Sequence, residues 1–599
     1  MIVYQNTKKG FLEDFINENL INLLKTLTKN IINVTPSPSE IRAWENSLKE
    51  MFIVLSDSKI DENILIAIEY QIPATSKRID FLAIDNEKMA IIELKQWEKI
   101  EKTSMPNVVK TLIGGKKRET IHPSYQVYSY ARFIKDFNIF ARKLEIIPCV
   151  YMHNMEKNSK FSDYEIVKNT KIFFKNERKK LIEFLSEFKP SKNILEKLDS
   201  SALCPSKSLI DSLSDMLKGN EEFVLLDEQR LVFEKALDLA KKSGTKNKTI
   251  YIVKGGPGSG KSVVAINLLV EFIKRKKNAR YVTKNASIRE VSKEKLKGEY
   301  KNRTIDMLFT SSGSFINALK DEYDVLIVDE AHRLNEKSGI FNNLGENRIK
   351  EIINASKLSI FFIDEDQKVT FKDIGSRDEI KKWAEYFGAE IYEDELKSQF
   401  RCNGSDGYIA WLDNVLEIKE SANKTLDGVD YDFRVFDDVN EMYEELQKRK
   451  NSAIVAGYCW DWVSKKENRD DIVIGNFSKK WNLNEDKGLW LLKNPLNQVG
   501  CIHTIQGLEC DYIGVIIGDD LIYDNGIKTQ PEKRAKTDKS LNGYKKMLKS
   551  NPEQAKKSAD KIIKNTYRVL MSRGLKGCYV YAIDEKLREY LKGRILDFQ

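Results

Sequence analysis

The sequence predicts an α/β fold in which an N-terminal α/β domain precedes two lobes built on parallel β-sheets. From about residue 223 onward, short apolar segments alternate with helix-like segments, the pattern of parallel sheets covered on both faces. A glycine-rich segment at residues 255–262 directly follows one of these apolar segments. Residues 1–190 differ, because helical periodicity gives way there to extended apolar runs at residues 64–70, 79–84 and 89–95.

The composition is that of an ordinary folded chain. With 599 residues, 41% hydrophobic and 32% charged, it has room for about four domain-sized units and is neither collagen-like nor disordered. No apolar run approaches the roughly 18 residues of a membrane-spanning helix, and no secretory signal pattern is visible. Seven scattered cysteines without a Cys-x-x-Cys pair argue against a disulfide scaffold or a cysteine-based zinc site. We therefore expect a cytoplasmic protein with no membrane association.

The net charge of +9 is concentrated in one segment. Residues 528–564 contain 12 Lys or Arg and 4 Asp or Glu, a local charge of 12 − 4 = +8. Such a run is either a solvated surface or mobile insertion, or an arm that follows the phosphates of a nucleic acid. Both interpretations stay open on the sequence alone.

The pattern divides the chain into four segments. An N-terminal domain (1–190) is followed by a linker or helical connector (191–222), a first lobe (223–403) and a second lobe (404–599) that contains the lysine-rich insertion near 528–564. The expected strands of the first lobe are 249–254, 279–283, 323–328 and 358–363. A helical stretch near 404–425 precedes those of the second lobe, 432–436, 452–456, 512–517 and 577–583.

The glycine-rich segment has the form G-x-x-x-x-G-K-S, between an expected strand and an apolar helix. It consists of Gly255, Gly256, Pro257, Gly258, Ser259, Gly260, Lys261 and Ser262. Its glycines let backbone N–H groups surround phosphates, and the helix that follows adds a favourable dipole. We expect Lys261 to reach the β- and γ-phosphates of ATP and the Ser262 hydroxyl to bind Mg²⁺.

A pair of carboxylates completes the predicted ATP site. The apolar run 324–328 ends in Asp329 and Glu330. Unpaired charges at the end of a buried strand are costly, so a functional role is favoured over a solvated turn. Asp329 is expected to bind Mg²⁺, and Glu330 to polarise the attacking water.

Five further polar segments follow a fixed order along the chain: 227–229 (Asp-Glu-Gln), 363–367 (Ile-Asp-Glu-Asp-Gln), 396–401 (Leu-Lys-Ser-Gln-Phe-Arg), 503–509 (His-Thr-Ile-Gln-Gly-Leu-Glu) and 567–574 (Tyr-Arg-Val-Leu-Met-Ser-Arg-Gly). With the glycine-rich segment, this set resembles the motifs of superfamily 1 helicases, and more closely the Schlafen group 3-like helicase domains, over roughly residues 220–599. The resemblance implies two RecA-like lobes that hydrolyse ATP between them.

The resemblance also implies roles for single residues. Gln229 would recognise adenine, Gln367 would sense the γ-phosphate, and Arg401 and Arg573 would be arginine fingers from either side of the cleft between the lobes. Gln506 and Gly507 are assigned to the nucleotide site. The chain departs from the usual superfamily 1 pattern at His332, where glutamine is common.

The N-terminal domain carries a second constellation of charged residues. Residues 78–84 and 89–95 are predicted to form a hairpin, in which Glu93 and Lys95 lie two positions apart and share a face. Asp80 on the partner strand can join them. Two carboxylates and a lysine can hold Mg²⁺, or alternatively Mn²⁺, for phosphodiester cleavage. A structural salt bridge is the alternative interpretation of these residues.

This region resembles the PD-(D/E)xK nucleases of the restriction-endonuclease-like fold, with Asp80, Glu93 and Lys95 in the signature positions. The resemblance implies a further acidic metal ligand on the first core helix, for which Glu45 is the candidate. It also implies that Gln126 and Tyr130, a Gln-x-x-x-Tyr element of helicase-associated nucleases, orient DNA and the lysine. An ordinary amphipathic helix face is the alternative interpretation of that element.

These features predict an ATP-dependent helicase or translocase fused to a metal-dependent nuclease that acts on nucleic acid, DNA more than RNA. Fusions of this kind resemble enzymes of anti-phage defence or DNA processing. The alternative is a nucleic-acid-binding ATPase switch whose N-terminal domain binds without cleaving. An ATPase of the kinase or transporter type is a more distant alternative, because it leaves the ordered later motifs unexplained. A homo-oligomer or a partner subunit is compatible with each.

Overall fold

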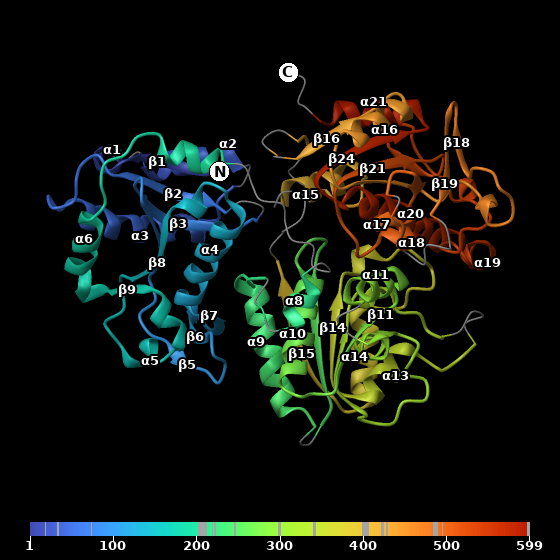
Figure 1. The fold of residues 1–599 in the computed structure, drawn as a ribbon, viewed down its shortest axis with the longest axis horizontal. Helices are drawn as coiled ribbons and strands as arrows, with labels where there is room; N and C mark the ends of the chain where they lie inside the picture. The colour runs from blue at the N-terminus through green and yellow to red at the C-terminus, as the bar shows by residue number, and fades with distance from the viewer. Residues whose placement is uncertain are drawn as a thin grey trace. The chain divides into compact units, whose positions relative to one another are not determined.

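The structure is a computed structural model. It describes residues 1–595 apart from 18–19, 33–34, 73–74, 202–211, 219, 221–222, 245–246, 298–300, 339–342, 398–405, 421–423, 427–428, 430, 483–488 and 494. The chain divides into two units, Met1–Lys207 with Phe223–Asp238, and Ser208–Glu222 with Leu239–Gln599 (Figure 1). No helix among the described residues is long and apolar enough to cross a membrane.

The first unit is built on a six-stranded mixed sheet. Its strand order is β1-β2-β3-β4-β8-β9, with antiparallel pairing from β1 to β4 and parallel pairing from β4 through β8 to β9. The strands are β1 (Ile2–Thr7), β2 (Leu65–Gln71), β3 (Arg78–Ile84), β4 (Lys88–Lys95), β8 (Glu145–Met152) and β9 (Lys171–Phe174). A smaller sheet contains β5 (Glu101–Lys102), β6 (Val108–Ile113) and β7 (Lys116–Ile121).

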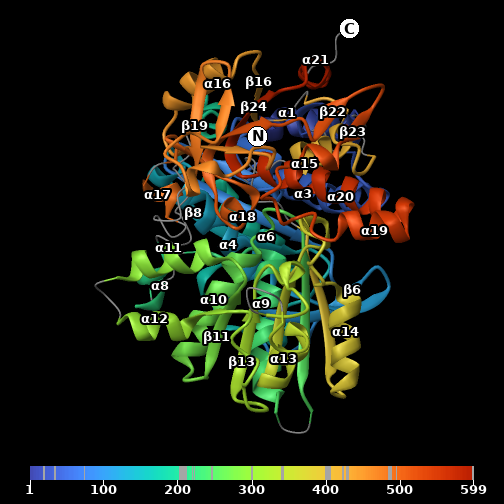
Figure 2. The same ribbon diagram turned by 90° about the vertical axis from the view of Figure 1, so that its right-hand side faces the viewer.

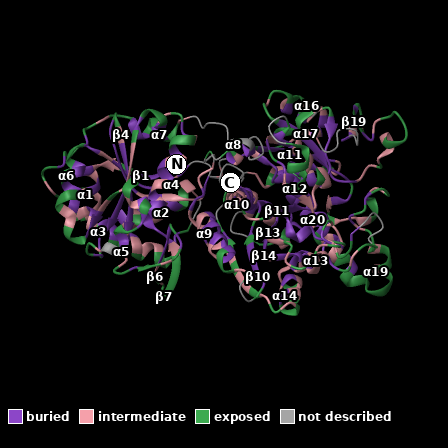
Figure 3. Ribbon diagram, turned by 60° about the horizontal axis from the view of Figure 1, so that its bottom comes forward, coloured by how far each residue is buried: buried purple, intermediate pink, exposed green. Residues whose placement is uncertain are grey.

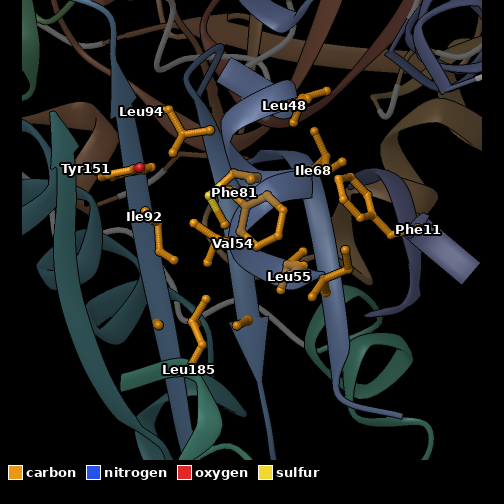
Figure 4. Close-up of a cluster of buried hydrophobic side chains, with 14 of the residues drawn as sticks. Phe11, Leu48, Val54, Leu55, Ile68, Phe81, Ile92, Leu94, Tyr151 and Leu185 are labelled. Carbon is orange, nitrogen blue, oxygen red and sulfur yellow. The ribbon is translucent and has the colours of Figure 1, made fainter. Parts of the chain in front are cut away.

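The two faces of this large sheet differ in character. Ile68, Phe81 and Ile92 point to a face where they pack against Leu48 and Val54, as Figure 4 shows. Because side chains alternate along a strand, the neighbouring residues of β3 and β4 point to the other face. Helices of the apolar face are α1 (Lys8–Ile16), α2 (Leu20–Ile32), α3 (Pro38–Leu55) and α6 (Arg178–Ser186), whereas α4 (Pro123–Phe137) packs on β4 and β8. Short helices α5 (Ser159–Ser162) and α7 (Ile194–Asp199) complete the described part of residues 1–207.

The second unit contains a first lobe with an all-parallel sheet. Its order is β12-β11-β13-β14-β10-β15, and its strands are β10 (Thr249–Gly255), β11 (Ala279–Thr283), β12 (Phe309–Ser311), β13 (Tyr323–Val328), β14 (Ser356–Ile363) and β15 (Glu390–Leu396). Helices α13 (Arg348–Ala355) and α14 (Arg377–Tyr386) cover the face that carries Leu326 and Phe361 (Figure 2). The other helices are α8 (Leu213–Leu217), α10 (Lys261–Lys274), α11 (Ala286–Leu296) and α12 (Asn302–Leu308).

The second lobe also has a parallel sheet, ordered β16-β24-β21-β17. Its strands are β16 (Asp432–Val435), β17 (Ser452–Ala456), β21 (Cys510–Ile517) and β24 (Gly574–Ala582). Around it lie β18 (Ile472–Ile474), β19 (Phe477–Trp481), β20 (Gln498–Val499), β22 (Leu521–Tyr523), β23 (Ile527–Thr529), α15 (Asp406–Val415), α16 (Val439–Gln447), α17 (Trp490–Lys493), α18 (Ile502–Ile505), α19 (Tyr544–Ser550), α20 (Pro552–Met571) and α21 (Glu585–Gly593). The predicted fold class, an α/β domain followed by two parallel-sheet lobes, is confirmed.

The lysine-rich segment 528–564 is folded against the second lobe. The Arg534 guanidinium is buried and lies 2.7 Å from Asp520 and 2.9 Å from Asp538. Because both carboxylates are buried as well, this cluster fixes the start of the segment to the lobe. Farther along, α19 is largely exposed (Figure 3), so its lysines face solvent.

Candidate functional sites

The loop before α10 places a lysine ammonium among backbone carbonyls. Gly258 and Gly260 have φ angles of 74° and 80°, which glycine adopts without steric cost. A Cβ on Gly255 would lie 2.4 Å from the Ser259 hydroxyl, so the loop has no room for a side chain there. The Lys261 ammonium donates to the carbonyl oxygen of Gly255 at 2.7 Å. This cation is buried within the loop, where the charge of a phosphate would complement it.

Two oxygen ligands lie side by side at the start of α10. The Ser262 hydroxyl donates to Asp329 Oδ2 at 2.6 Å, and the Tyr281 hydroxyl donates to the same oxygen. Burial raises the pKa of Asp329, and repulsion from Glu330 adds to this effect. A hydroxyl and a buried carboxylate in contact fit Mg²⁺, which prefers oxygen ligands and keeps several waters.

Glu330 is held in a different electrostatic environment. Its backbone has a φ of 53°, an uncommon conformation for this residue type, and its Oε2 lies 3.0 Å from His332 Nε2. Burial by itself would raise the pKa of Glu330, but His332 and then Lys261 and Arg573 bring the pKa well below its usual value. Glu330 is therefore ionised at neutral pH and able to accept a proton or orient a water.

An arginine of the second lobe contacts a residue of the first lobe near the glycine-rich loop. Arg573 Nη2 donates to Gln367 Oε1 at 3.3 Å, and its Nε donates to the Val569 carbonyl at 3.0 Å. Gln367 Nε2 in turn donates to Asp364 Oδ2 at 2.6 Å, and that carboxylate is 3.9 Å from the Lys261 ammonium. The structure thus links Arg573, Gln367 and Lys261 through one buried chain of contacts.

Gln506 and Gly507 join the same region from the second lobe. Gln506 Nε2 lies 3.3 Å from His332 Nε2, and its Oε1 accepts from Arg333. A Cβ on Gly507, which has a φ of +82°, would lie 2.6 Å from Ile288. These two residues therefore form part of the surface between the lobes, next to the strand end that carries Glu330.

Gln229 and Arg401 were also predicted to belong to the ATP site. Gln229 belongs to the part of helix α9 (Asp227–Lys242) that is grouped with the first unit, where its Oε1 accepts from the Leu226 N–H at 3.2 Å. Arg401 lies outside the described residues. Their roles stay predictions.

The first unit brings Asp80, Glu93 and Lys95 together on the face opposite the apolar core. Phe81 pairs with Ile92 across β3 and β4, so the next position along places Asp80 opposite Glu93. The Leu94 N–H donates to Asp80 Oδ2 at 2.8 Å, and the Lys95 ammonium donates to Glu93 Oε1 at 2.5 Å. Glu93 Oε2 is buried and has no hydrogen-bond partner among the described residues.

The electrostatics of these carboxylates favour a cation. Burial raises the pKa of Asp80 to about 6, although Lys95 opposes this. Burial, followed by repulsion from Asp80, raises the pKa of Glu93 to about 8. No group of three or more His, Cys, Asp or Glu side chains in the described part of the chain is arranged as a metal site. Two carboxylates still suffice for Mg²⁺, which takes its remaining ligands from water and substrate phosphates.

The Gln-x-x-x-Tyr element lies on α4, which packs on β4. Gln126 Nε2 donates to the Tyr130 hydroxyl at 3.1 Å, and the Tyr130 hydroxyl donates to Asp227 Oδ2 at 2.6 Å. Burial, and then the charge of Asp227, raise the pKa of Tyr130. Glu45, by contrast, lies on the exposed side of α3.

Glu69 is an acid of this region that the sequence analysis missed. It lies on β2 with a φ of 56°, and its Oε1 accepts from Trp44 Nε1 at 2.7 Å. Burial raises the pKa of Glu69, while Arg78, 2.9 Å from its Oε2, lowers it. Its charge in turn raises the pKa of Asp80. The sequence contained one signal for this residue, because Glu69 is a single acid within the otherwise apolar segment of β2.

Comparisons with known proteins agree with the two units. Residues 41–153 match a nuclease-related domain, and residues 248–584 match the Schlafen group 3 DNA/RNA helicase domain. A Saccharomyces cerevisiae protein described as uncharacterized protein YPL245W is 28% identical over 435 residues, which cover 64% of this chain and 93% of that protein.

Two solved structures show weak similarity. The Pif1 helicase of Candida albicans is 13% identical, with a TM-score of 0.28 over 62% of this chain and 99% of that one. A DNA replication initiation factor is 16% identical, with a TM-score of 0.18. The match covers 34% of this chain and 54% of that one. The family matches cover more than half of the sequence, and the chain belongs to the Schlafen group 3 DNA/RNA helicase-domain family, with a nuclease-related domain ahead of the helicase domain.

Proposed function

We propose that the protein is an ATP-dependent helicase or translocase fused to a metal-dependent nuclease, and that it acts on nucleic acid, DNA in preference to RNA. The observation that carries this proposal is the contact of Arg573 with Gln367. It supports an ATPase in which the second lobe supplies a charge to the first, so that hydrolysis depends on how the lobes meet. Such dependence is what converts ATP turnover into movement along a strand.

Within the ATP site, each residue has a task that follows from its surroundings. Lys261 would exchange the loop carbonyls for the β- and γ-phosphates, and Ser262 and Asp329 would hold Mg²⁺, which would neutralise phosphate charge. Glu330, kept ionised, orients the water, and Arg573 stabilises the charge that develops on the transferred phosphoryl group. The loop residues Gly255, Gly256, Pro257, Gly258, Ser259 and Gly260, with Gln229, Gln367, Arg401, Gln506 and Gly507, complete the site that the resemblance implies.

In the nuclease centre, Asp80 and Glu93 would hold Mg²⁺ or Mn²⁺, which supplies a polarised water and neutralises phosphate charge. The Lys95 ammonium, fixed at 2.5 Å from Glu93, is placed to stabilise charge on the cleaved phosphodiester. Gln126 and Tyr130 would orient the strand. Glu69 is a better candidate than the exposed Glu45 for the additional acid, because its charge reaches Asp80.

Cleavage of labelled single- and double-stranded DNA and RNA tests the nuclease. Wild type, Asp80→Ala and a control, Glu87→Ala, are compared with Mg²⁺ or Mn²⁺ and with or without ATP. Glu87 is an exposed acid in the turn of the same hairpin. We expect wild type and E87A to cut DNA and D80A not to cut. Equal cutting by D80A, or cutting of RNA alone, would contradict the proposal.

Absence of cutting by every variant would favour the ATPase switch whose N-terminal domain binds but does not cleave. For the biological role we propose anti-phage defence or DNA processing. Plaque counts on cells that express wild type or D80A measure the first of these roles, and equal counts would argue against it.

A further inference from the structure

The first turn of α9 places two carboxylates beside the nuclease centre. Asp227 Oδ2 accepts from the Tyr130 hydroxyl at 2.6 Å and lies 2.9 Å from the Lys77 ammonium. Glu228 accepts from the same ammonium, at 2.8 Å to Oε2 and 3.0 Å to Oε1. The side chains of Lys77 and Asp227 are 17% and 15% exposed, so this pair is largely withdrawn from water.

These contacts belong to the same buried region as the catalytic carboxylates. Lys77 directly precedes β3, the strand of Asp80, and Tyr130 lies on α4, which packs on β4, the strand of Glu93 and Lys95. Asp227 contacts both side chains, because its carboxylate accepts from the Tyr130 hydroxyl and lies against the Lys77 ammonium. The first turn of α9 therefore contacts residues that lie next to both strands of the nuclease centre.

The donors in this place suit a phosphate better than a carboxylate of the chain itself. A lysine ammonium and a phenol hydroxyl are groups that bind the phosphate oxygens of a nucleic-acid backbone. Asp227 Oδ1, in contrast, is buried with no hydrogen-bond partner among the described residues. Asp227 also has a φ of 35°, in the left-handed region that is unfavourable for a non-glycine residue. The contacts of Asp227 with Lys77 and Tyr130 are therefore accompanied by an unsatisfied carboxylate oxygen and an unfavourable backbone conformation.

We propose that Lys77 and Tyr130 form a seat for a backbone phosphate of the nucleic-acid strand, and that Asp227 and Glu228 close this seat until the strand displaces them. The first turn of α9 is then an internal anionic plug. This inference rests on the proposed nuclease function for its consequence, which is that the nuclease is restrained in the free protein. The seat itself does not require cleavage.

The binding of a short single-stranded DNA oligonucleotide tests the seat without cleavage. Affinity and its salt dependence are measured in EDTA for full-length protein carrying Asp80→Asn, with and without Asp227→Asn and Glu228→Gln. These changes keep the shape of the plug and remove its charges. Asp238→Asn is the control, because Asp238 lies on the same helix and accepts from Ser104, at 3.0 Å, outside the seat.

We expect D227N/E228Q to bind about tenfold more tightly than the D238N control. The slope of log K against log salt should steepen by about 0.7, the value for one added phosphate contact on a single strand. A further Lys77→Gln change should remove both gains. Binding no tighter than that of D238N, or a gain that survives K77Q, would overturn the proposal.

Cleavage by the same variants with Asp80 intact separates this inference from the proposed function. With the seat open, we expect the KM for the oligonucleotide to fall about tenfold in D227N/E228Q and to stay at the wild-type value in D238N. An unchanged KM in active enzyme would count against the plug. Tight, Lys77-dependent binding without any cutting would instead support the phosphate seat and contradict the proposed nuclease function.

Discussion

Substitution of Glu93 by glutamine should stabilise the metal-free first unit at alkaline pH. In the unfolded chain this carboxyl group has its usual pKa of 4.5, whereas burial raises the pKa of Glu93 to about 8 in the folded unit. Between these two pH values the native state keeps a proton that the unfolded state has lost. The free energy of unfolding therefore falls as pH rises through this window, and glutamine, which does not titrate, removes the effect.

The size of this effect follows from the two pKa values. Each tenfold difference in proton affinity corresponds to about 1.4 kcal/mol, so the interval from 4.5 to about 8 sets an upper limit of about 5 kcal/mol. Asp80 raises and Lys95 lowers the pKa of Glu93, so the carboxyl groups do not titrate independently, and we expect a loss of about 3 kcal/mol between pH 5 and pH 8. This corresponds to roughly a 100-fold fall in the protection of core amides against hydrogen exchange.

Hydrogen exchange of peptides that cover β4, corrected for the intrinsic pH dependence, measures this loss in EDTA. Wild type should lose protection from pH 5 to pH 8, E93Q should not, and the control Glu87→Gln should behave as wild type. Mg²⁺ at pH 8 should restore protection in wild type and leave the protection of E93Q unchanged, because a bound cation stabilises the ionised pair. Constant protection in wild type, or the same loss in E93Q, would refute this reasoning.

Three further substitutions test other contacts. Lys261→Ala should lower ATPase turnover at least 100-fold in a phosphate-release assay, whereas Lys254→Ala, an exposed neighbour, should not. Arg573→Lys should lower kcat for ATP about 1,000-fold with little change in KM, because a lysine cannot reproduce the planar guanidinium contact with Gln367. Arg534→Ala should lower the free energy of unfolding by about 3–5 kcal/mol in urea titrations, because two buried carboxylates lose their partner, whereas exposed Lys533→Ala should change it little.

Each of these outcomes can fail in a distinct way. ATP turnover by purified K261A at the wild-type rate would show that the glycine-rich loop is not part of the ATP site. A large rise in KM for R573K would mean that Arg573 binds the ground state and not the transition state. Equal stability of R534A and K533A would show that the buried cluster does not anchor the lysine-rich segment.

The strands that frame both sites could be predicted because they are buried and apolar. Strands β2, β3 and β4, and the β10 and β13 strands that precede residues of the predicted ATP site, each contain four consecutive apolar residues. Strand β15 was not predicted, since its sequence Glu-Ile-Tyr-Glu-Asp-Glu-Leu is half-exposed and highly charged. Only its pairing with β10 makes it a strand.

The side chains of the sites were harder to place than the strands. Glu45 follows the buried Trp44 by one position on α3, and one residue along a helix turns a side chain by about 100°, toward solvent. Glu69 of β2 has a left-handed backbone conformation, which cannot be predicted from the apolar sequence of the strand. Asp227 contacts Tyr130 from 97 positions away in the sequence, a distance at which no local pattern operates.

Strand β15 also bears on how this protein behaves in concentrated solution. It lies at the end of the strand order of its sheet, and its carboxylates are Glu390, Glu393, Asp394 and Glu395. An open strand edge invites pairing with another molecule, and repulsion between like charges is one means by which proteins prevent such pairing. Acidification below about pH 4 neutralises glutamates and aspartates. Self-association through this edge should therefore increase in acid.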